Sequence, residues 1–350
     1  IVVGGVGGAG GSAGGHGGLL VPGYSVLVSA RSYGPENEMT NQSRVIYTSD
    51  FSLYSAGERP NGLTGMLRVQ PACTVGSWHR VRGPLESAAC FPSRKKTMTE
   101  SYAAVPSRFI LENMSVAWAM ASGGLRSVLP LPKQGTLDTS PLDLTMKAPS
   151  SALLAAYDRW SGMDTARFGE TLAPHFAAAR MAMGTISRLT ARAPYPLLSV
   201  LNQGVSLRIN TPLPRTGPFQ LHGELLDASD DGYRARIHSR ISIGPKDDPQ
   251  AMIIDAYAAV MIKSRPKSSQ EKAPAERDFA TIGQWQAGAK EGVTFFKLTG
   301  DFNPIHTLPA MARRTRFKGC IMHGYGCFAQ VFETIRNQGH DIAEIDVRFI

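Results

Sequence analysis

Apolar residues recur at helical spacing along three segments in the first two thirds of the chain. Segment 105–125 has this spacing and ends near a Gly pair, where a helix can stop. Two Ala-rich segments, 150–162 and 166–193, repeat the spacing, and Pro174 interrupts the second. The pattern predicts amphipathic helices in all three segments.

After these segments the pattern changes to short apolar runs that alternate with polar residues, as strands do. Turn-forming residues separate the runs at 212–214, 230–232 and 245–248. A helix followed by several antiparallel strands is the order of a hot-dog fold, an α+β fold whose curled sheet wraps a central helix. The predicted strands are 205–209, 219–228, 233–243 and 251–262.

Composition divides the chain into four parts. Residues 1–100 mix Gly, Ser, Pro, Arg and Cys with little sustained period, so we expect them to be irregular. Residues 101–263 hold the helices and strands above and predict a non-catalytic hot-dog-like domain. Residues 264–278 are rich in Pro, Ser and charge, as linkers are. Residues 279–350 form a second unit.

Three polar side chains lie in one short loop of this second unit, within the sequence Lys297-Leu-Thr-Gly-Asp-Phe-Asn-Pro-Ile-His306. Asn303 follows Asp301 by two residues, and His306 follows it by five. Pro304 stiffens the loop, because its ring fixes φ. Side chains at these spacings can converge on one point.

A glycine turn, His323-Gly-Tyr-Gly326, then leads into a predicted helix at 328–335, and a strand is predicted at 341–350. The start of a helix presents free N–H groups to negative charge. Over residues 295–335, the loop and the turn together resemble the signature of the MaoC-like hydratases. These enzymes are also called (R)-specific enoyl-CoA hydratases or hydratase 2, and they have the hot-dog fold.

Two segments of the first unit, 193–209 and 223–243, are similar to the N-terminal half of double hot-dog dehydratases. The resemblance therefore implies a double hot-dog. Family members continue with further strands after the one that corresponds to 341–350, so we expect an incomplete C-terminal unit. Two departures, Cys320 and Met322, stand where the family commonly has small residues or Pro, and they are expected to narrow the pocket.

Hydration of a trans-2-enoyl thioester needs an activated water, a proton for the α-carbon and donors at the thioester oxygen. A carboxylate and an imidazole that touch one water can supply both proton transfers. The resemblance implies that Asp301 and His306 hold and activate the water and that Asn303 orients it. It also implies that the Gly324 N–H binds the thioester oxygen and that Tyr325 contacts the substrate.

Each of these residues also has a structural interpretation. Asp301 is a residue type that forms turns and caps helices, and Asn303 precedes a proline as in ordinary loops. His306 alone is typical of a satisfied, half-buried histidine. His323 is most simply explained by a hydrogen bond that holds the turn. Packing does not readily explain the whole pattern of residues.

The chain carries a net charge of +9 and has a pI near 9.5, which suits an anionic partner. No aromatic residues interleave with the basic ones as in single-strand nucleic-acid binding, so no nucleic acid is expected. A solvated basic surface is the simplest explanation. A functional alternative is that a basic cluster beside the signature attracts the phosphates of coenzyme A. This cluster consists of Arg313, Arg314, Arg316 and Lys318.

The four cysteines, Cys73, Cys90, Cys320 and Cys327, form no CxxC pair and have no metal-type spacing with His. This suits a reducing compartment, either the cytoplasm or a peroxisomal or other organellar matrix, rather than secretion. No apolar run is long enough to span a bilayer. A homodimer is left open.

The glycine-rich start contains Gly5-x-Gly7-x-x-Gly10, a formal dinucleotide-binding pattern, and Arg31 is of the type that receives a 2′-phosphate. A run of glycines matches this pattern by chance, however, and no Tyr-x-x-x-Lys pair follows. We therefore expect no redox cofactor and no metal, with coenzyme A or an acyl-carrier thioester as the substrate carrier.

The prediction is a hydro-lyase that interconverts trans-2-enoyl and (R)-3-hydroxyacyl thioesters in fatty-acid metabolism. Two alternatives remain. One is a hot-dog thioesterase, and the other is a non-catalytic subunit that binds acyl-CoA.

Overall fold

The structure is a computed structural model that describes residues 20–21, 25–32, 45–54, 63–70, 105–120, 137–195, 200–263, 280–288, 290–315 and 317–349. The glycine pattern at the start of the chain, the predicted linker, Cys73, Cys90 and Arg316 lie outside the described residues.

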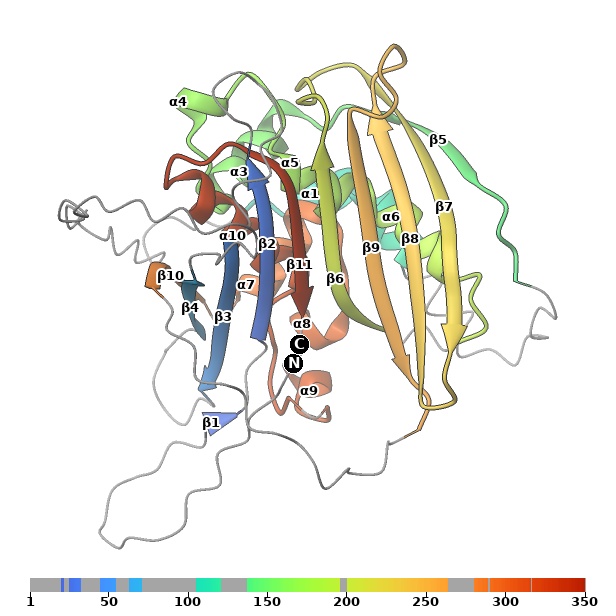
Figure 1. Ribbon diagram of the computed structural model, residues 1–350, viewed down its shortest axis with the longest axis vertical. Helices are drawn as coiled ribbons and strands as arrows, with labels where there is room; N and C mark the ends of the chain where they lie inside the picture. The colour runs from blue at the N-terminus through green and yellow to red at the C-terminus, as the bar shows by residue number, and fades with distance from the viewer. Residues whose placement is uncertain are drawn as a thin grey trace, which may run out of the picture.

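Within these residues the strands form one continuous antiparallel sheet made of two halves (Figure 1). The first half has the strand order β6-β9-β8-β7-β5. The predicted strands are confirmed there, although β6 starts earlier than predicted. The bounds are β5 Leu142–Lys147, β6 Val200–Ile209, β7 Pro218–Asp230, β8 Arg234–Gly244 and β9 Met252–Met261.

The second half has the order β10-β4-β3-β2-β11, and the two halves meet where β11 pairs with β6. In both halves the strand before the central helix lies at the outer edge, and the strand after it lies at the seam. A short strand, β1, pairs with β3. The bounds are β1 Leu20–Val21, β2 Ser25–Ser32, β3 Val45–Tyr54, β4 Leu63–Gln70, β10 Ala280–Ala287 and β11 Ile342–Phe349.

Two predictions are corrected by this second half. The expectation that residues 1–100 are irregular is wrong for β2, β3 and β4. The C-terminal unit was expected to lack strands, but these three strands occupy the positions between β10 and β11. β2 pairs with β11 and β4 pairs with β10, each more than two hundred residues away in sequence, so periodicity within a short window does not reveal where these strands join the sheet.

Helices are confirmed within the predicted segments 150–162 and 166–193, and within 105–120 of the third segment, whose remaining residues lie outside those described. Ser150 caps α3 by accepting the Leu153 N–H at 3.2 Å, and Gly162 ends it in the left-handed region at φ 79°. Pro174 begins α5, and one π-helical turn then leads into α6. The bounds are α1 Arg108–Glu112, α3 Ser151–Ser161, α4 Thr165–Phe168, α5 Pro174–Phe176, η2 Ala177–Met181 and α6 Met183–Thr190.

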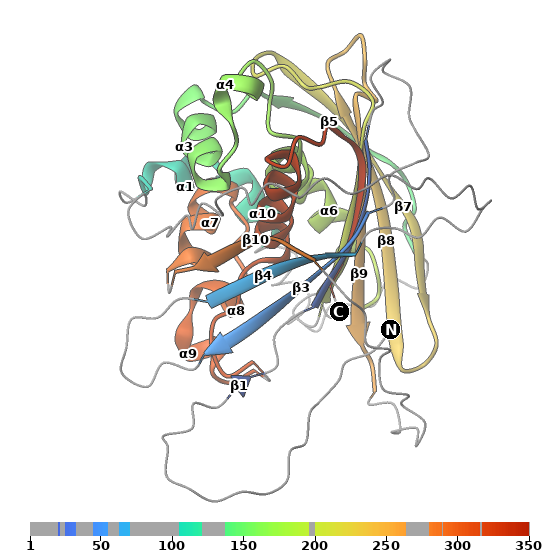
Figure 2. The same cartoon turned by 60° about the vertical axis from the view of Figure 1, so that its left-hand side comes forward.

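The helices of both halves lie on the same face of the sheet, which curls beneath α6 and α10 (Figure 2). Phe176 and Met181 from the first half share one buried cluster with Phe328 and Phe332 of α10. The fold is therefore a double hot-dog of the α+β class. The remaining helices are α7 Glu291–Thr299, α8 Pro304–Thr307, α9 Pro309–Ala312 and α10 Gly324–Arg336.

Candidate active site

The loop between α7 and α8 turns the chain sharply into the interior. Gly300 ends α7 with φ 80°, a conformation that favours glycine. Asn303 caps α8 by accepting the Ile305 N–H at 3.2 Å, and Pro304 occupies the first helical position. The Asp301 side chain between these two turns is only 7 % exposed. Asn303 therefore has a structural role in addition to its predicted one.

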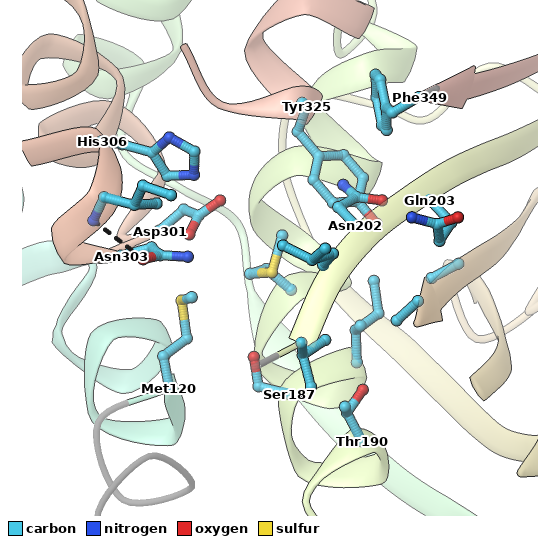
Figure 3. Close-up of a pocket in the computed structure, with 18 of the residues that line it drawn as sticks. Met120, Ser187, Thr190, Asn202, Gln203, Asp301, Asn303, His306, Tyr325 and Phe349 are labelled. Carbon is cyan, nitrogen blue, oxygen red and sulfur yellow. Dashed lines mark hydrogen bonds between the residues drawn. The ribbon is translucent and has the colours of Figure 1, made fainter. Parts of the chain in front are cut away.

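The His306 ring is fixed in one tautomer by its backbone partner. Its Nδ1 lies 2.9 Å from the carbonyl oxygen of Ile321, which can only accept a hydrogen bond. Nδ1 must therefore carry the proton, which leaves Nε2 with a lone pair. His306 and Asp301 both border one cavity, as Figure 3 shows. The ring can thus accept a proton from a molecule in that cavity.

His323 supports the two residues from behind. Its Nε2 donates to the backbone carbonyl oxygen of Asp301 at 2.9 Å, and its ring centroid lies 3.9 Å from that of His306. The ring is fully buried. The structural interpretation of His323, a hydrogen bond that holds the turn, therefore fits its geometry.

Burial shifts the pKa values of the two candidate proton-transfer groups, Asp301 and His306, in opposite directions. It raises the pKa of the Asp301 carboxyl to about 7 and lowers the pKa of the His306 imidazole to about 4. Burial, with the nearby His306, also holds the pKa of His323 well below its usual value. Near neutral pH the site thus holds neutral imidazoles and a carboxyl that is ready to gain or lose a proton.

The cavity has a volume of about 450 Å³ and takes side chains from both halves of the fold. The predicted residues Asp301, Asn303, His306, Gly324 and Tyr325 all line it. Their proximity is a property of the fold, while their catalytic roles stay predictions. Met322 also lines the cavity, whereas Cys320 is not among the lining residues.

Gly324 is the first residue of α10. The N–H groups of a first helical turn have no carbonyl partner within the helix, because no preceding turn exists. A Cβ at this position would lie 2.9 Å from the ring of Phe349 and 3.2 Å from Nδ2 of Asn202. A larger residue would therefore crowd the cavity. Gly324 thus lines the cavity at the start of α10, and its oxyanion role stays a prediction.

The basic cluster is not brought into the cavity. Arg313, Arg314 and Lys318 are exposed and do not line it, although Met311 and Thr315 close by do. Arg316 lies outside the described residues. Binding of coenzyme A phosphates by this cluster stays a prediction.

Sequence reasoning missed Asn202 and Gln203, which line the cavity from β6 (Figure 3). The register of β6 against β9 shifts between Asn202 and Gly204, which marks a bulge. A Cβ on Gly204 would collide with the carbonyl oxygen of Val347 at the seam between the halves. An isolated Gly within a strand pattern is the signal that could have indicated this bulge.

Within the described residues, no group of three or more His, Cys, Asp or Glu side chains is arranged to hold a metal ion. None of the helices that the structure describes is both long and apolar enough to cross a bilayer.

A comparison with known families agrees with the second half of this fold. The profile of the family described as "MaoC like domain" matches residues 268–350, which hold the loop, the glycine turn and α10. The chain contains a MaoC-like domain. The match begins inside the segment that we predict to be a linker, and the domain boundaries stay predictions.

The chain is also similar to a peroxisomal hydratase-dehydrogenase-epimerase of Neurospora crassa, with 24 % identity over 149 residues. This match covers 39 % of the chain but only 17 % of that relative, so the chain spans a small part of its length.

Three solved structures are similar at low identity. HtdX of Mycobacterium tuberculosis is 17 % identical with a TM-score of 0.47, over 59 % of this chain and 82 % of that one. A MaoC-like dehydratase from Phytophthora capsici is 15 % identical with a TM-score of 0.45, over 59 % and 78 %. The peroxisomal multifunctional enzyme type 2 of Drosophila melanogaster is 21 % identical with a TM-score of 0.41, over 63 % and 41 %.

Proposed function

We propose that this protein hydrates trans-2-enoyl thioesters to (R)-3-hydroxyacyl thioesters and catalyses the reverse dehydration. One observation supports this most strongly: His306 and Asp301, with pKa values moved apart by burial, border one cavity at the start of α10. The MaoC-like profile over the same residues and the hydratase named among the relatives support the same reaction class.

In the proposed mechanism, His306 is the base. Its Nε2 takes a proton from water while the water oxygen bonds to the β-carbon of the enoyl group. The electron pair of the double bond moves toward the thioester oxygen, where the Gly324 N–H at the start of α10 stabilises the developing charge. The protonated carboxyl of Asp301 delivers its proton to the α-carbon. Transfer of the proton from His306 to Asp301 then restores both groups.

These steps are acid–base chemistry alone, so we propose that the reaction needs no redox cofactor and no metal. Coenzyme A or an acyl-carrier protein would carry the acyl group. The peroxisomal relative makes a peroxisomal matrix a fitting compartment. Assembly as a homodimer stays a prediction.

The purified chain should be mixed with trans-2-decenoyl-CoA while the absorbance of the conjugated enoyl group is followed. We expect the absorbance to fall and the product to be the (R)-3-hydroxyacyl-CoA on chiral analysis. His306→Gln should abolish the change, whereas the exposed His340→Gln should leave it intact. Release of free thiol would indicate a thioesterase instead, and binding without turnover would indicate a non-catalytic subunit.

A further inference from the structure

The end of the cavity away from His306 is built from the first half of the fold. There, α6 contributes Ser187 and Thr190, whose side chains lie across the cavity from His306 in Figure 3. On the sheet side, β8 contributes Ile237 and Ser239, and β9 contributes Ala256, Tyr257 and Ala258. This end therefore combines apolar walls with three hydroxyl groups.

Ser239 is an exception within its strand. The inward-facing row of β8 is otherwise apolar, and Ser239 stands between Ile237 and Ile241 in that row. The side chain is 1 % exposed and lines the cavity. Among the described residues, its Oγ has no hydrogen-bond partner. A buried hydroxyl without a partner is costly, which suggests that a molecule in the cavity completes it.

The order of the strands sets the distance between Ser239 and Gly324, where the thioester oxygen is proposed to bind. Asn202, which lies beside Gly324, pairs with Ala258 of β9. One inward position along β9, Ala256 pairs with Ser239 of β8. Two strand spacings separate β6 from β8, which is about 10 Å. A medium-length acyl chain bound at Gly324 would cross the small side chains of Ala256 and Ala258 and end near Ser239.

The charges of the lining residues narrow the chemistry further. Among the described residues that line the cavity, only Asp301 and His306 have acidic or basic side chains, and both lie at its other end. Among the described residues that line the Ser239 end, no cation could neutralise a carboxylate. An uncharged oxygen that donates or accepts a hydrogen bond fits the three hydroxyls better.

We propose that this site selects enoyl thioesters whose acyl tail carries an uncharged oxygen, a hydroxyl or keto group, that hydrogen-bonds to Ser239. This inference rests on the proposed hydratase function and adds a specificity that the function alone does not require. A purely alkyl tail would enter the same cavity but would leave the Ser239 hydroxyl without a partner.

The test compares trans-2-decenoyl-CoA with the same compound hydroxylated at its terminal carbon. We expect kcat/KM to favour the hydroxylated substrate by about tenfold, since its hydroxyl gains a buried hydrogen bond and the alkyl tail leaves the Ser239 hydroxyl unpaired. Ser239→Ala should remove this preference by lowering kcat/KM for the hydroxylated substrate only. Ser242→Ala, three residues further along β8 and on its outer face, is the matched control and should alter kcat/KM for neither substrate.

Equilibrium binding of the saturated pair, decanoyl-CoA and its terminal hydroxy form, separates this inference from the hydratase proposal. A binding preference that Ser239→Ala removes supports the tail inference even without turnover. Turnover with equal kcat/KM and equal affinity for both tails would overturn the tail inference and leave the hydratase proposal standing. Equal losses on both substrates in Ser239→Ala would show a purely structural role and overturn it as well. If neither acyl-CoA binds, both proposals fail.

Discussion

Two enclosed histidines of this protein, His175 and His306, are bonded in different ways. His175 lies 2.9 Å through Nδ1 from the Tyr157 hydroxyl and 2.8 Å through Nε2 from a Glu333 carboxylate oxygen. Arg336 donates to the same oxygen at 3.0 Å. Both ring nitrogens of His175 are therefore occupied. His306 uses one nitrogen for a backbone carbonyl and borders the cavity with the rest of its ring.

The difference separates a structural polar network from a reactive one. The His175 network joins α3 and α5 of the first half to α10 of the second, and it is buried away from the cavity. Three hydrogen bonds link its groups, so it connects the two halves, although the second carboxylate oxygen of Glu333 has no partner among the described residues. At the cavity, His306 and Asp301 are enclosed without such mutual pairing, which is the arrangement that shifts pKa values and leaves groups free to react.

The largest expected effect is on turnover. Asp301→Asn should lower kcat by at least a hundredfold, because the amide cannot deliver a proton to the α-carbon. The matched control is Asp341→Asn, at an exposed aspartate paired with Arg167. Loss of enoyl absorbance measures the rates. Near-normal turnover of Asp301→Asn would contradict the proposed mechanism.

A change at His175, in the structural network, should affect stability rather than turnover. His175→Phe removes the partner of the Tyr157 hydroxyl and one partner of the Glu333 carboxylate, both buried, so we expect a loss of about 2 kcal/mol in the free energy of unfolding. Urea denaturation measures this loss, and kcat per folded molecule should stay within about twofold. A large fall in kcat with unchanged stability would mean that the two sites are not separate.

The shifted pKa values predict a pH profile for the hydration reaction. Activity should fall as His306 gains a proton near pH 4 and as Asp301 loses its proton near pH 7. Rates of hydration measured across this range in buffers of constant ionic strength test the prediction. A rate that rises through pH 7 would show that ionised Asp301 is the active form.

The same carboxyl makes stability depend on pH. Its pKa is raised from about 4 in the unfolded chain to about 7 in the folded one, so the folded state holds the proton more tightly. The stability that this provides is complete below about pH 4 and is lost as the pH rises through 7. Asp301→Asn should therefore raise Tm relative to wild type more at pH 8 than at pH 5, as thermal denaturation would measure. An equal difference at both pH values would argue against the raised pKa.

The smallest expected effect concerns the basic cluster. Changing both Arg313 and Arg314 to Glu should raise KM for acyl-CoA about threefold at low salt, with little change at high salt, because exposed charges are screened. The single variant Arg313→Glu should raise KM less than the double variant does. Its control is Arg236→Glu, the same change of charge at an exposed residue of β8, which should leave KM unchanged. If KM does not change, the cluster is a solvated surface that does not attract the phosphates of coenzyme A.

Much of the site could be predicted from local sequence. Asp301, Asn303 and His306 lie in one short loop whose turn is set by Gly300 and Pro304, so their proximity needs no distant contact. The glycine turn at 323–326 likewise indicates the start of α10. In the first half, clean alternation and turn residues were enough to predict the strands β7, β8 and β9.

Other features depend on contacts between segments far apart in the chain. The insertion of β2, β3 and β4 between β10 and β11 depends on the pairing of β2 with β11 and of β4 with β10, which local sequence cannot indicate. The same holds for Asn202, which lines the cavity next to the bulge where the register of β6 against β9 shifts.

The sequence by itself determined the reactive groups, their order and the local turns that present them. Only the tertiary structure decided how deeply each group is buried. Burial moves the pKa of Asp301 and His306 apart, and it is also what isolates Ser239 and encloses the His175 network. The reason is physical: spacing along a chain fixes which side chains can meet, whereas loss of water around them depends on every element packed against the site.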